Sequence, residues 1–186
     1  MGDKPVVFLL SVNDDVLERL VAAAIADADP AEVMPPVAGP AGWTAQRRDA
    51  FRAFHRARRG GLAGALHEST FAVAADGRIA GSARLELKEP GTLEAGLWLA
   101  RSARGRGIGT AVLRALLEEA AKAGAVTVVA ETTMTNAAAV GVLRRSGGMF
   151  SADQGSGHVH AEIRVMQPPA EPAVSPAVKG PSSPGR

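Results

Sequence analysis

The fold is decided by the stretch Arg104-Gly105-Arg106-Gly107-Ile108-Gly109-Thr110. It follows an expected strand over residues 93–100 and opens an expected helix whose apolar side chains recur at helical spacing. A turn between a strand and a helix presents backbone N–H groups beside the positive end of the helix, and glycines let an anion approach them closely. The stretch therefore predicts a pyrophosphate-binding loop, and an ordinary glycine-rich connection is the alternative.

Two other phosphate-binding folds fit the sequence less well. A dinucleotide-binding loop follows the first strand of a parallel sheet, whereas turn signals at Asp76-Gly77 and Pro90-Gly91 predict antiparallel strands before this loop. The lysine and Ser/Thr pair of a Walker motif is absent. We therefore expect the loop to belong to neither of those folds.

The chain on both sides of the loop alternates strands and helices. Expected strands cover residues 5–10, 71–74, 79–87, 93–100, 126–130, 149–152 and 158–166. Expected helices follow the capping residues Asn13 or Asp14, Thr44 and Asn136, and another opens at the loop. Residues 29–42 predict an irregular connection because prolines and glycines interrupt them.

Length and composition limit the domain organisation and the compartment. The 186 residues, 46% of them hydrophobic, suffice for one domain, which we place at residues 1–166, and residues 167–186 predict a disordered tail rich in Pro, Ser, Ala and Gly. The absence of cysteine excludes disulfides and cysteine nucleophiles. No apolar run reaches the roughly 18 to 20 residues of a membrane helix. These features predict a cytoplasmic protein with no membrane partner.

Two segments resemble the GNAT acetyltransferases. Residues 104–109 resemble the (Gln/Arg)-x-x-Gly-x-(Gly/Ala) element of that superfamily, and residues 136–148, with a leading Asn and a terminal Gly, resemble its second cofactor segment. The resemblance implies an α/β (α+β) GNAT fold: a mixed, strongly twisted sheet of about six to seven strands, with helices on both faces and splayed central strands. It also implies acetyl-CoA as cosubstrate, with its pantetheine arm in the gap between those strands.

The resemblance further implies which residues bind acetyl-CoA. The backbone near two strand leucines would face the pantetheine amides, the backbone of the loop would hold the pyrophosphate, and one asparagine would line the same channel. These residues are Leu97, Leu99, Arg104, Gly105, Arg106, Gly107, Ile108, Gly109, Thr110 and Asn136. For Asn136, a helix N-cap is an equally good interpretation and is compatible with the first.

The general acid of the reaction is not assigned by the sequence. Leu143 stands where many members of the superfamily have a tyrosine, and Ala139 stands where the Rim-type branch can have a serine. Ser146, another hydroxyl or water could protonate the leaving thiolate. A thiol pKa near about 8.5 makes the thiolate a tolerable leaving group without much help.

A carboxylate on the strand before the loop is the candidate general base. Strand alternation puts Glu94, Gly96 and Trp98 on one face, and the missing side chain at Gly96 leaves room for a substrate. The alternative is an exposed glutamate beside a half-buried core tryptophan, and for Trp98 the residues alone slightly favour this structural role. The run Glu-x-Gly-x-Trp-Leu resembles the Rim-type branch, however, and this resemblance favours Glu94 as the catalytic base. Glu131, near the end of the next strand, is the second candidate.

Charged and histidine residues elsewhere suggest weaker alternatives. The arginine-rich helix over residues 47–59 could touch RNA, but such faces are usually solvated, and the net charge is only +2, so a nucleic-acid partner is not expected. His67, His158 and His160 lack the spacing of a metal site, and no metal is expected.

The resemblance implies an acetyl-CoA-dependent N-acetyltransferase acting on a primary amine. Residues 39–44 and the arginine helix resemble the start of actinobacterial aminoglycoside acetyltransferases, such as those of the kasugamycin type. This resemblance favours a small antibiotic amine as acceptor and a role in antibiotic resistance. Carboxylates for such a polycation are available at Glu68, Glu86, Glu94, Glu131 and Asp153. The alternatives are a Rim-type protein N-terminal acetyltransferase and a catalytically idle acyl-CoA-binding module. The oligomeric state is open, with a homodimer as one possibility.

Overall fold

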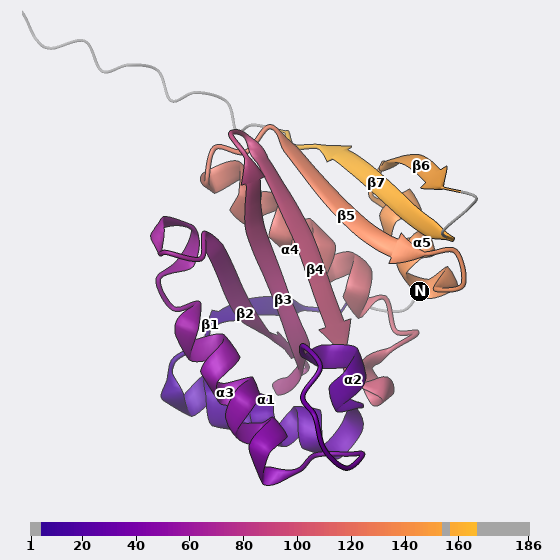
Figure 1. Cartoon of the computed structure of the whole chain (residues 1–186). Coiled ribbons are helices and arrows are strands. Elements are labelled where there is room, and N and C mark those ends of the chain that lie inside the picture. The colour runs from indigo at the N-terminus through magenta and orange to yellow at the C-terminus, as the bar shows by residue number, and fades with distance from the viewer. Residues whose placement is uncertain (1–4, 154–156, 167–186) are drawn as a thin grey trace, which may run out of the picture.

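The computed structural model describes residues 5–153 and 157–166, so the tail expected at 167–186 lies outside the described residues. One seven-stranded sheet has the order β1-β2-β3-β4-β5-β7-β6 (Figure 1). The strands are β1 Val7–Ser11, β2 Glu68–Ala75, β3 Arg78–Glu89, β4 Thr92–Leu99, β5 Thr127–Thr133, β6 Met149–Asp153 and β7 His158–Arg164. The helices are α1 Asp14–Asp27, α2 Pro30–Val33, α3 Ala45–Ala57, α4 Ile108–Lys122 and α5 Ala137–Arg145, with short 3₁₀ turns η1 Gly61–Ala63 and η2 Arg101–Ala103.

The two central strands pair over a short distance only. Every neighbouring pair of strands is antiparallel except β4 and β5, which run parallel. Their register runs from Thr92 opposite Thr127 to Glu94 opposite Val129 and ends there. Residues 95–99 and 130–133 then have no partner in each other's strand. The mixed sheet with splayed central strands is therefore confirmed.

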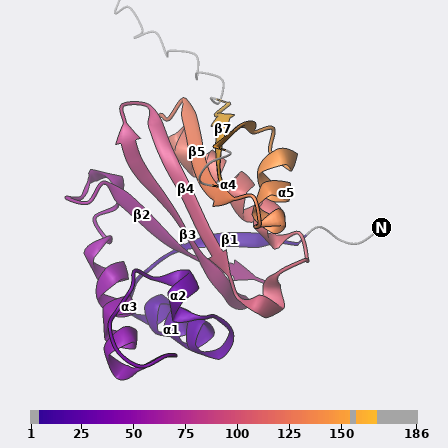
Figure 2. The ribbon, with the colours of Figure 1, turned by 45° about the vertical axis from the view of Figure 1, so that its right-hand side comes forward.

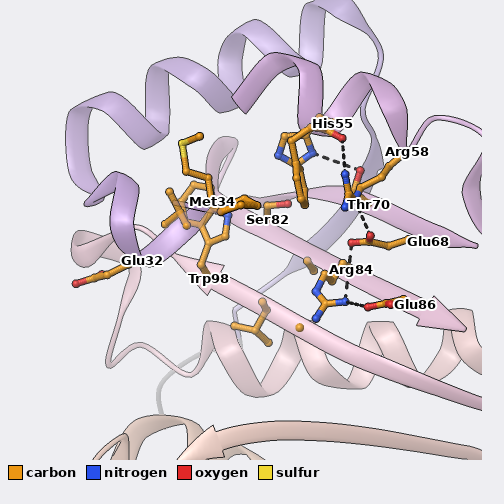
Figure 3. A pocket seen from close by; sticks show the side chains of 16 residues that line it. Glu32, Met34, His55, Arg58, Glu68, Thr70, Ser82, Arg84, Glu86 and Trp98 are labelled. Atoms are coloured by element: carbon orange, nitrogen blue, oxygen red, sulfur yellow. Dashed lines mark hydrogen bonds and ion pairs between the residues drawn. The ribbon is translucent and has the colours of Figure 1, made fainter. Parts of the chain in front are cut away.

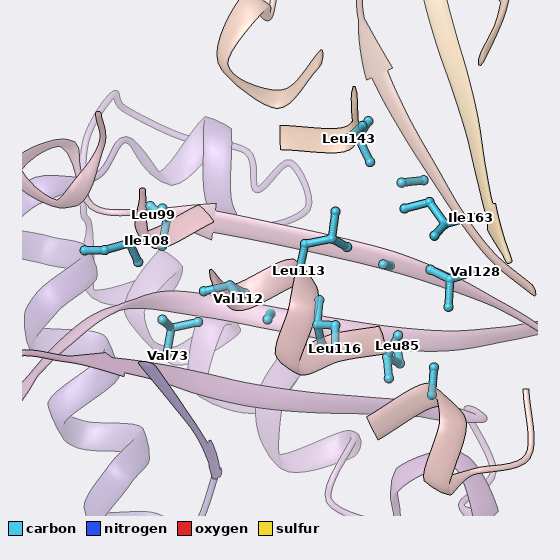
Figure 4. Packing of buried hydrophobic residues seen from close by; sticks show 14 of the residues in the cluster. Val73, Leu85, Leu99, Ile108, Val112, Leu113, Leu116, Val128, Leu143 and Ile163 are labelled. Atoms are coloured by element: carbon cyan, nitrogen blue, oxygen red, sulfur yellow. The ribbon is translucent and has the colours of Figure 1, made fainter. Parts of the chain in front are cut away.

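Helices cover both faces of the sheet, as expected (Figure 2). On one face, Val112, Leu113 and Leu116 of α4 are fully buried against the sheet, as Figure 4 shows. On the other face, α1 and α3 form a second core that includes Leu17 and Phe51. The sheet thus separates two apolar layers, and β4 has a different environment on each side.

Capping residues set the helix starts as the sequence predicts. The side-chain oxygens of Asn13, Thr44 and Asn136 each accept a hydrogen bond from a backbone N–H of the first turn, over 2.9, 3.2 and 3.1 Å. These bonds satisfy N–H groups that have no partner within the helix.

Helix α2 departs from the irregular connection expected over residues 29–42. Asp29 caps this four-residue helix by accepting a hydrogen bond from the Ala31 N–H at 2.9 Å, and Pro30 occupies the first helical position. Such a short helix has no apolar periodicity to reveal it. The following loop is held by Arg47, whose guanidinium donates to the carbonyls of Gly42 at 2.7 Å and Val37 at 3.0 Å.

Two further arginines, one in α3 and one just after it, also have partners within the protein. Arg52 pairs with Glu18 at 2.8 Å, and Arg59 donates to the Val12 carbonyl at 3.0 Å. Together with Arg47 they tie α3 to α1 and to the loop before it. From the sequence, these arginines were expected either to contact a nucleic acid or to face solvent. The structure shows instead that Arg47, Arg52 and Arg59 bind other parts of the protein.

Gly81 provides a test of how closely β3 and β4 approach. A Cβ at Gly81 would overlap the Trp98 carbonyl oxygen and lie 2.9 Å from Leu99 Cα, and neither backbone atom can move without distorting β4. We expect Gly81→Ala to lower the free energy of unfolding by roughly 2–3 kcal/mol in urea titrations. Gly96→Ala is the matched control, because its Cβ would meet only the movable Arg84 side chain and should cost less. Equal losses in the two variants would contradict this interpretation.

Candidate active site

A cleft opens where β4 and β5 diverge, and we call it the interstrand cleft. Its volume is about 850 Å³, and it is bounded by the second half of β4, the end of β5, the loop before α4 and the first turns of α5. Eight of the ten residues predicted to bind the cofactor line it: Leu97, Leu99, Arg104, Gly105, Gly107, Gly109, Thr110 and Asn136. Segments far apart in the sequence are thereby brought around one cavity.

Two predicted residues contribute differently. Ile108 is 1% exposed and packs in the core beneath α4. The Arg106 guanidinium pairs with Asp76 at 2.6 Å, in the turn between β2 and β3. Its charge is therefore directed at that turn and not into the cleft.

The three loop glycines meet different constraints. Gly105 and Gly107 have φ angles of 75° and 79°, in the left-handed region that glycine adopts without strain. Gly109 lies inside the first turn of α4, where a Cβ would come within 3.3 Å of Val142 Cγ2. Gly107 is the N-cap of α4 and supplies no side-chain hydrogen bond. The N–H groups of the first turn therefore remain open to an anion in the cleft.

The positive charge at the loop comes from an unexpected position. Arg104, predicted to face the anion, donates from Nε to the Leu99 carbonyl at 3.0 Å and pairs with Glu32 at 3.0 Å. Arg145 from α5 also lines the cleft, with Nε and Nη2 each 3.3 Å from Thr110 Oγ1. No carboxylate of the described residues pairs with Arg145. Sequence analysis missed it, although it lies within the second cofactor-like segment.

The hydroxyl groups of the cleft come from threonines. Leu143 and Ala139 both line it and carry no proton to donate. Ser146 is not among the lining residues, and its hydroxyl donates to the Val142 carbonyl at 3.1 Å. Thr132 and Thr135 do line the cleft, so hydroxyls are present there at positions that the sequence did not single out.

A second cavity, which we call the helix-side cavity, lies on the other face of β4. It has a volume of about 530 Å³ and is enclosed by α2, α3 and strands β2, β3 and β4 (Figure 3). Glu32, Gly96, Leu97 and Trp98 line both this cavity and the interstrand cleft. The two cavities therefore meet at the free end of β4. In Figure 3 the Glu32 carboxylate points away from the other side chains of the cavity.

A ladder of three carboxylates begins in the wall of the helix-side cavity, which its first two members line. Glu68, Glu86 and Glu94 lie directly opposite one another on β2, β3 and β4. Like charges in register repel, and three cations neutralise them. Arg58 lies 2.5 Å from Glu68. Arg84 lies 2.6 Å from Glu86 and is also paired with Glu94. Lys88 lies 2.8 Å from Glu94.

The candidate bases lie on different sides of β4. Glu94 lines neither cavity, its side chain is 16% exposed, and both of its oxygens have cationic partners. The room predicted above Gly96 is filled by Arg84, since a Cβ there would lie 2.8 Å from Arg84 Nε. Glu131 lines the interstrand cleft, is 68% exposed, and lies 4.0 Å from His160 Nδ1.

His55 is a residue of the helix-side cavity that sequence analysis did not consider by itself. It is 2% exposed, its Nδ1 is 3.3 Å from Thr70 Oγ1, and its ring contacts Phe51 and Phe54 edge-on. Burial, together with the nearby Arg58 charge, lowers the pKa of His55 to about 4. The imidazole is therefore neutral at physiological pH.

The described residues contain neither a metal-binding cluster nor a membrane-spanning helix. Within residues 5–153 and 157–166, no group of three or more His, Asp or Glu side chains is arranged to hold a metal ion. No helix of that same part of the chain has the length and apolar character needed to cross a membrane.

Known proteins place this geometry in a family. Solved structures with the same fold include RimJ from Mycobacterium smegmatis in complex with CoA-disulfide, with a TM-score of 0.69 and 19% identity over 87% of this chain and 84% of that one. RimL, a ribosomal L7/L12 alpha-N-protein acetyltransferase in complex with coenzyme A, has a TM-score of 0.63 and 18% identity over 86% of this chain and 94% of that one. The N-acetyltransferase PseH from Campylobacter jejuni, in complex with acetyl coenzyme A, has a TM-score of 0.61 and 12% identity over 86% of this chain and 99% of that one.

At these low sequence identities the solved structures establish the fold alone. A comparison with curated proteins found no match. The sequence pattern of one family, described as the Acetyltransferase (GNAT) family, matches residues 34–148, which is more than half of the chain. That range includes the glycine loop, both candidate bases and nearly all of the interstrand cleft. The chain belongs to the GNAT acetyltransferase family.

Proposed function

We propose that this protein transfers the acetyl group of acetyl-CoA to a primary amine of a small molecule. The observation that supports this proposal best is the meeting of two cavities at Gly96, Leu97 and Trp98. Acetyl-CoA in the interstrand cleft and an amine in the helix-side cavity would approach each other at the free end of β4. The helix-side volume of about 530 Å³ is in the range typical of small-molecule sites.

The cleft offers matching groups for each part of acetyl-CoA. Beyond Glu94 the edge of β4 that faces β5 lacks strand pairing, so its backbone polar groups are available to the pantetheine amides. The open N–H groups at the start of α4, with Arg145 beside them, suit the pyrophosphate. In the reaction, the amine loses a proton, its nitrogen bonds to the thioester carbon, and the C–S bond breaks. The products are the acetamide, CoA with its thiol reprotonated, and one proton.

For the base we retain Glu94, now acting through water, because it lines neither cavity directly. It lies on β4, two residues before the glycine at which the cavities meet. Glu131, inside the cleft, remains the second candidate.

Aminoglycosides remain the first class of acceptor to test, with protein N-termini as the alternative. Glu32, Glu68 and Glu86 line the helix-side cavity and are the carboxylates nearest to such an acceptor, although each is already paired with a cation. Glu131 is on the cleft side, and the Asp153 side chain is outside the described part of the structure. Protein N-termini stay the alternative acceptor because RimL, a structural neighbour, is named as a protein acetyltransferase.

An acetylation screen tests the function. Purified protein with acetyl-CoA is expected to add one acetyl mass to at least one small amine from a panel of aminoglycosides, polyamines and N-terminal peptides. Because the chain has no cysteine, a thiol reagent will report released CoA without background from the protein. Transfer to peptides alone would favour a Rim-type protein N-terminal acetyltransferase. Binding of acetyl-CoA without any transfer would favour a catalytically idle acyl-CoA-binding module.

Arg145 is expected to contribute to acetyl-CoA affinity. Arg145→Gln removes a cation beside the start of α4, and loss of one charge-assisted hydrogen bond should weaken binding roughly tenfold in calorimetric titrations. The difference from wild type should shrink as salt is added. Arg144→Gln is the matched control, because Arg144 faces the Phe150 ring and does not line the cleft. Similar losses in both variants would remove Arg145 from the site.

Glu94→Gln should lower turnover by roughly 10² to 10⁴ with little change in acetyl-CoA affinity, because it keeps the shape of the side chain and removes its basicity. The substitution also disturbs the ion pairs of Arg84 and Lys88. Glu86→Gln controls for that effect, since Glu86 pairs with the same two cations. Comparable losses in both variants would assign Glu94 a structural role, and a loss confined to Glu131→Gln would transfer the role of base to Glu131.

A further inference from the structure

The helix-side cavity contains two hydrogen-bonding groups that no residue in the described part of the chain uses. The only hydrogen bond of His55 to a described residue is made by Nδ1, which leaves Nε2 without a partner. Trp98 makes ring contacts but no hydrogen bond with any described residue, so its Nε1–H is also unused. Both residues line the cavity.

These two nitrogens are accessible and not hidden in the core. Among the described residues, no fully buried side-chain nitrogen or oxygen lacks a hydrogen-bond partner. The unpartnered nitrogens of His55 and Trp98 are therefore not fully buried, and both residues line this cavity. Figure 3 shows His55 on α3 and Trp98 on β4, and Met34 lines the same cavity.

The charged groups of the same cavity are already occupied. Glu68 and Glu86 each pair with an arginine, and Glu32 pairs with Arg104. A ligand would gain little from a further charge here, because binding it would require one of these ion pairs to be broken. The unused hydrogen-bonding capacity of the cavity is therefore electrically neutral, since the His55 imidazole is uncharged.

We infer that His55 and Trp98 select an acceptor whose amine is carried on a ring bearing uncharged oxygen atoms, as in an amino sugar. An indole N–H can only donate, so it requires an oxygen or nitrogen acceptor on the ligand. A neutral imidazole nitrogen pairs with a hydroxyl in either tautomer. Apolar walls from Met34, Pro35 and Phe54 suit the flat faces of a ring. This inference rests on the proposed acetyl transfer and narrows its substrate class.

The test compares three amines that differ in oxygen content and charge. Glucosamine and cyclohexylamine each place one primary amine on a six-membered ring, and only glucosamine has hydroxyls, whereas spermidine has several charges and no oxygen. The measured quantity is kcat/KM for each amine at saturating acetyl-CoA. We expect the wild-type protein to favour glucosamine over cyclohexylamine by at least about tenfold, as two neutral hydrogen bonds allow.

Two variants assign that preference to the proposed residues. Trp98→Phe keeps an aromatic ring and removes the N–H, and His55→Phe keeps a flat ring against Phe51 and Phe54. Each should reduce the glucosamine-to-cyclohexylamine ratio roughly 3- to 10-fold, chiefly through KM for glucosamine. His55, which lines the helix-side cavity alone, should leave KM for acetyl-CoA unchanged when it is replaced. Trp43→Phe is the matched control, since Trp43 donates to the Ala28 carbonyl and lines neither cavity.

The outcomes separate this inference from the proposed function. Transfer to cyclohexylamine or spermidine that equals or exceeds transfer to glucosamine would overturn the inference and leave the acetyltransferase proposal standing. A ratio that stays at the wild-type value in both Trp98→Phe and His55→Phe would overturn it as well. Absence of transfer to every amine and peptide tested would instead refute the proposed function. A parallel loss for glucosamine and cyclohexylamine in both variants would give the two rings a purely structural role.

Discussion

The short parallel pairing between β4 and β5 is the constraint on which the rest of the structure depends. Three residue pairs, ending at Glu94 and Val129, hold the two halves of the sheet together. Beyond them β5 continues along β7, while β4 ends where the interstrand cleft meets the helix-side cavity. Continued pairing would use the backbone groups of residues 95–99 within the sheet. The divergence leaves that edge open, and the buried α4 side chain of Leu113 supplies an apolar floor.

The carboxylate ladder is a second consequence of the sheet register. Pairing β2, β3 and β4 as observed aligns Glu68, Glu86 and Glu94, an arrangement that would be unfavourable without compensation. Arg84 lies at the centre and contacts all three, at the cost of filling the space above Gly96. Such partly buried ion pairs are weak evidence for added stability, but breaking one leaves a charge without its partner. The ladder therefore fixes the shape of the cavity wall more than it strengthens the fold.

The predictable parts of the molecule were those encoded locally. Glycines at set spacing before an amphipathic stretch identified the loop. Asn136 was correctly identified as a helix cap, because its side chain accepts a hydrogen bond from the Ala139 N–H, and it also lines the cleft. Arg104 is bound by Glu32 and by the Leu99 carbonyl. Both lie on other elements, so no local pattern could reveal these contacts. Helix α2 was too short to show a period. His55 entered the sequence argument only as one member of a basic helix, because its burial depends on how α3 packs on the sheet.

The balance of charge around the helix-side cavity bears on how an acceptor amine becomes reactive. An amine with a pKa near about 10.4 is protonated at neutral pH, and reaching the free base costs roughly 4 to 5 kcal/mol in water. In this cavity the carboxylates are paired and the imidazole is neutral, so no unpaired anion of the described residues offsets the desolvation of an ammonium group. Desolvation lowers the pKa of an amine. The cavity would therefore bind the free amine in preference to the ammonium ion. Part of the cost of deprotonation would then appear as weaker binding, and a base held in ion pairs would face a smaller cost within the complex.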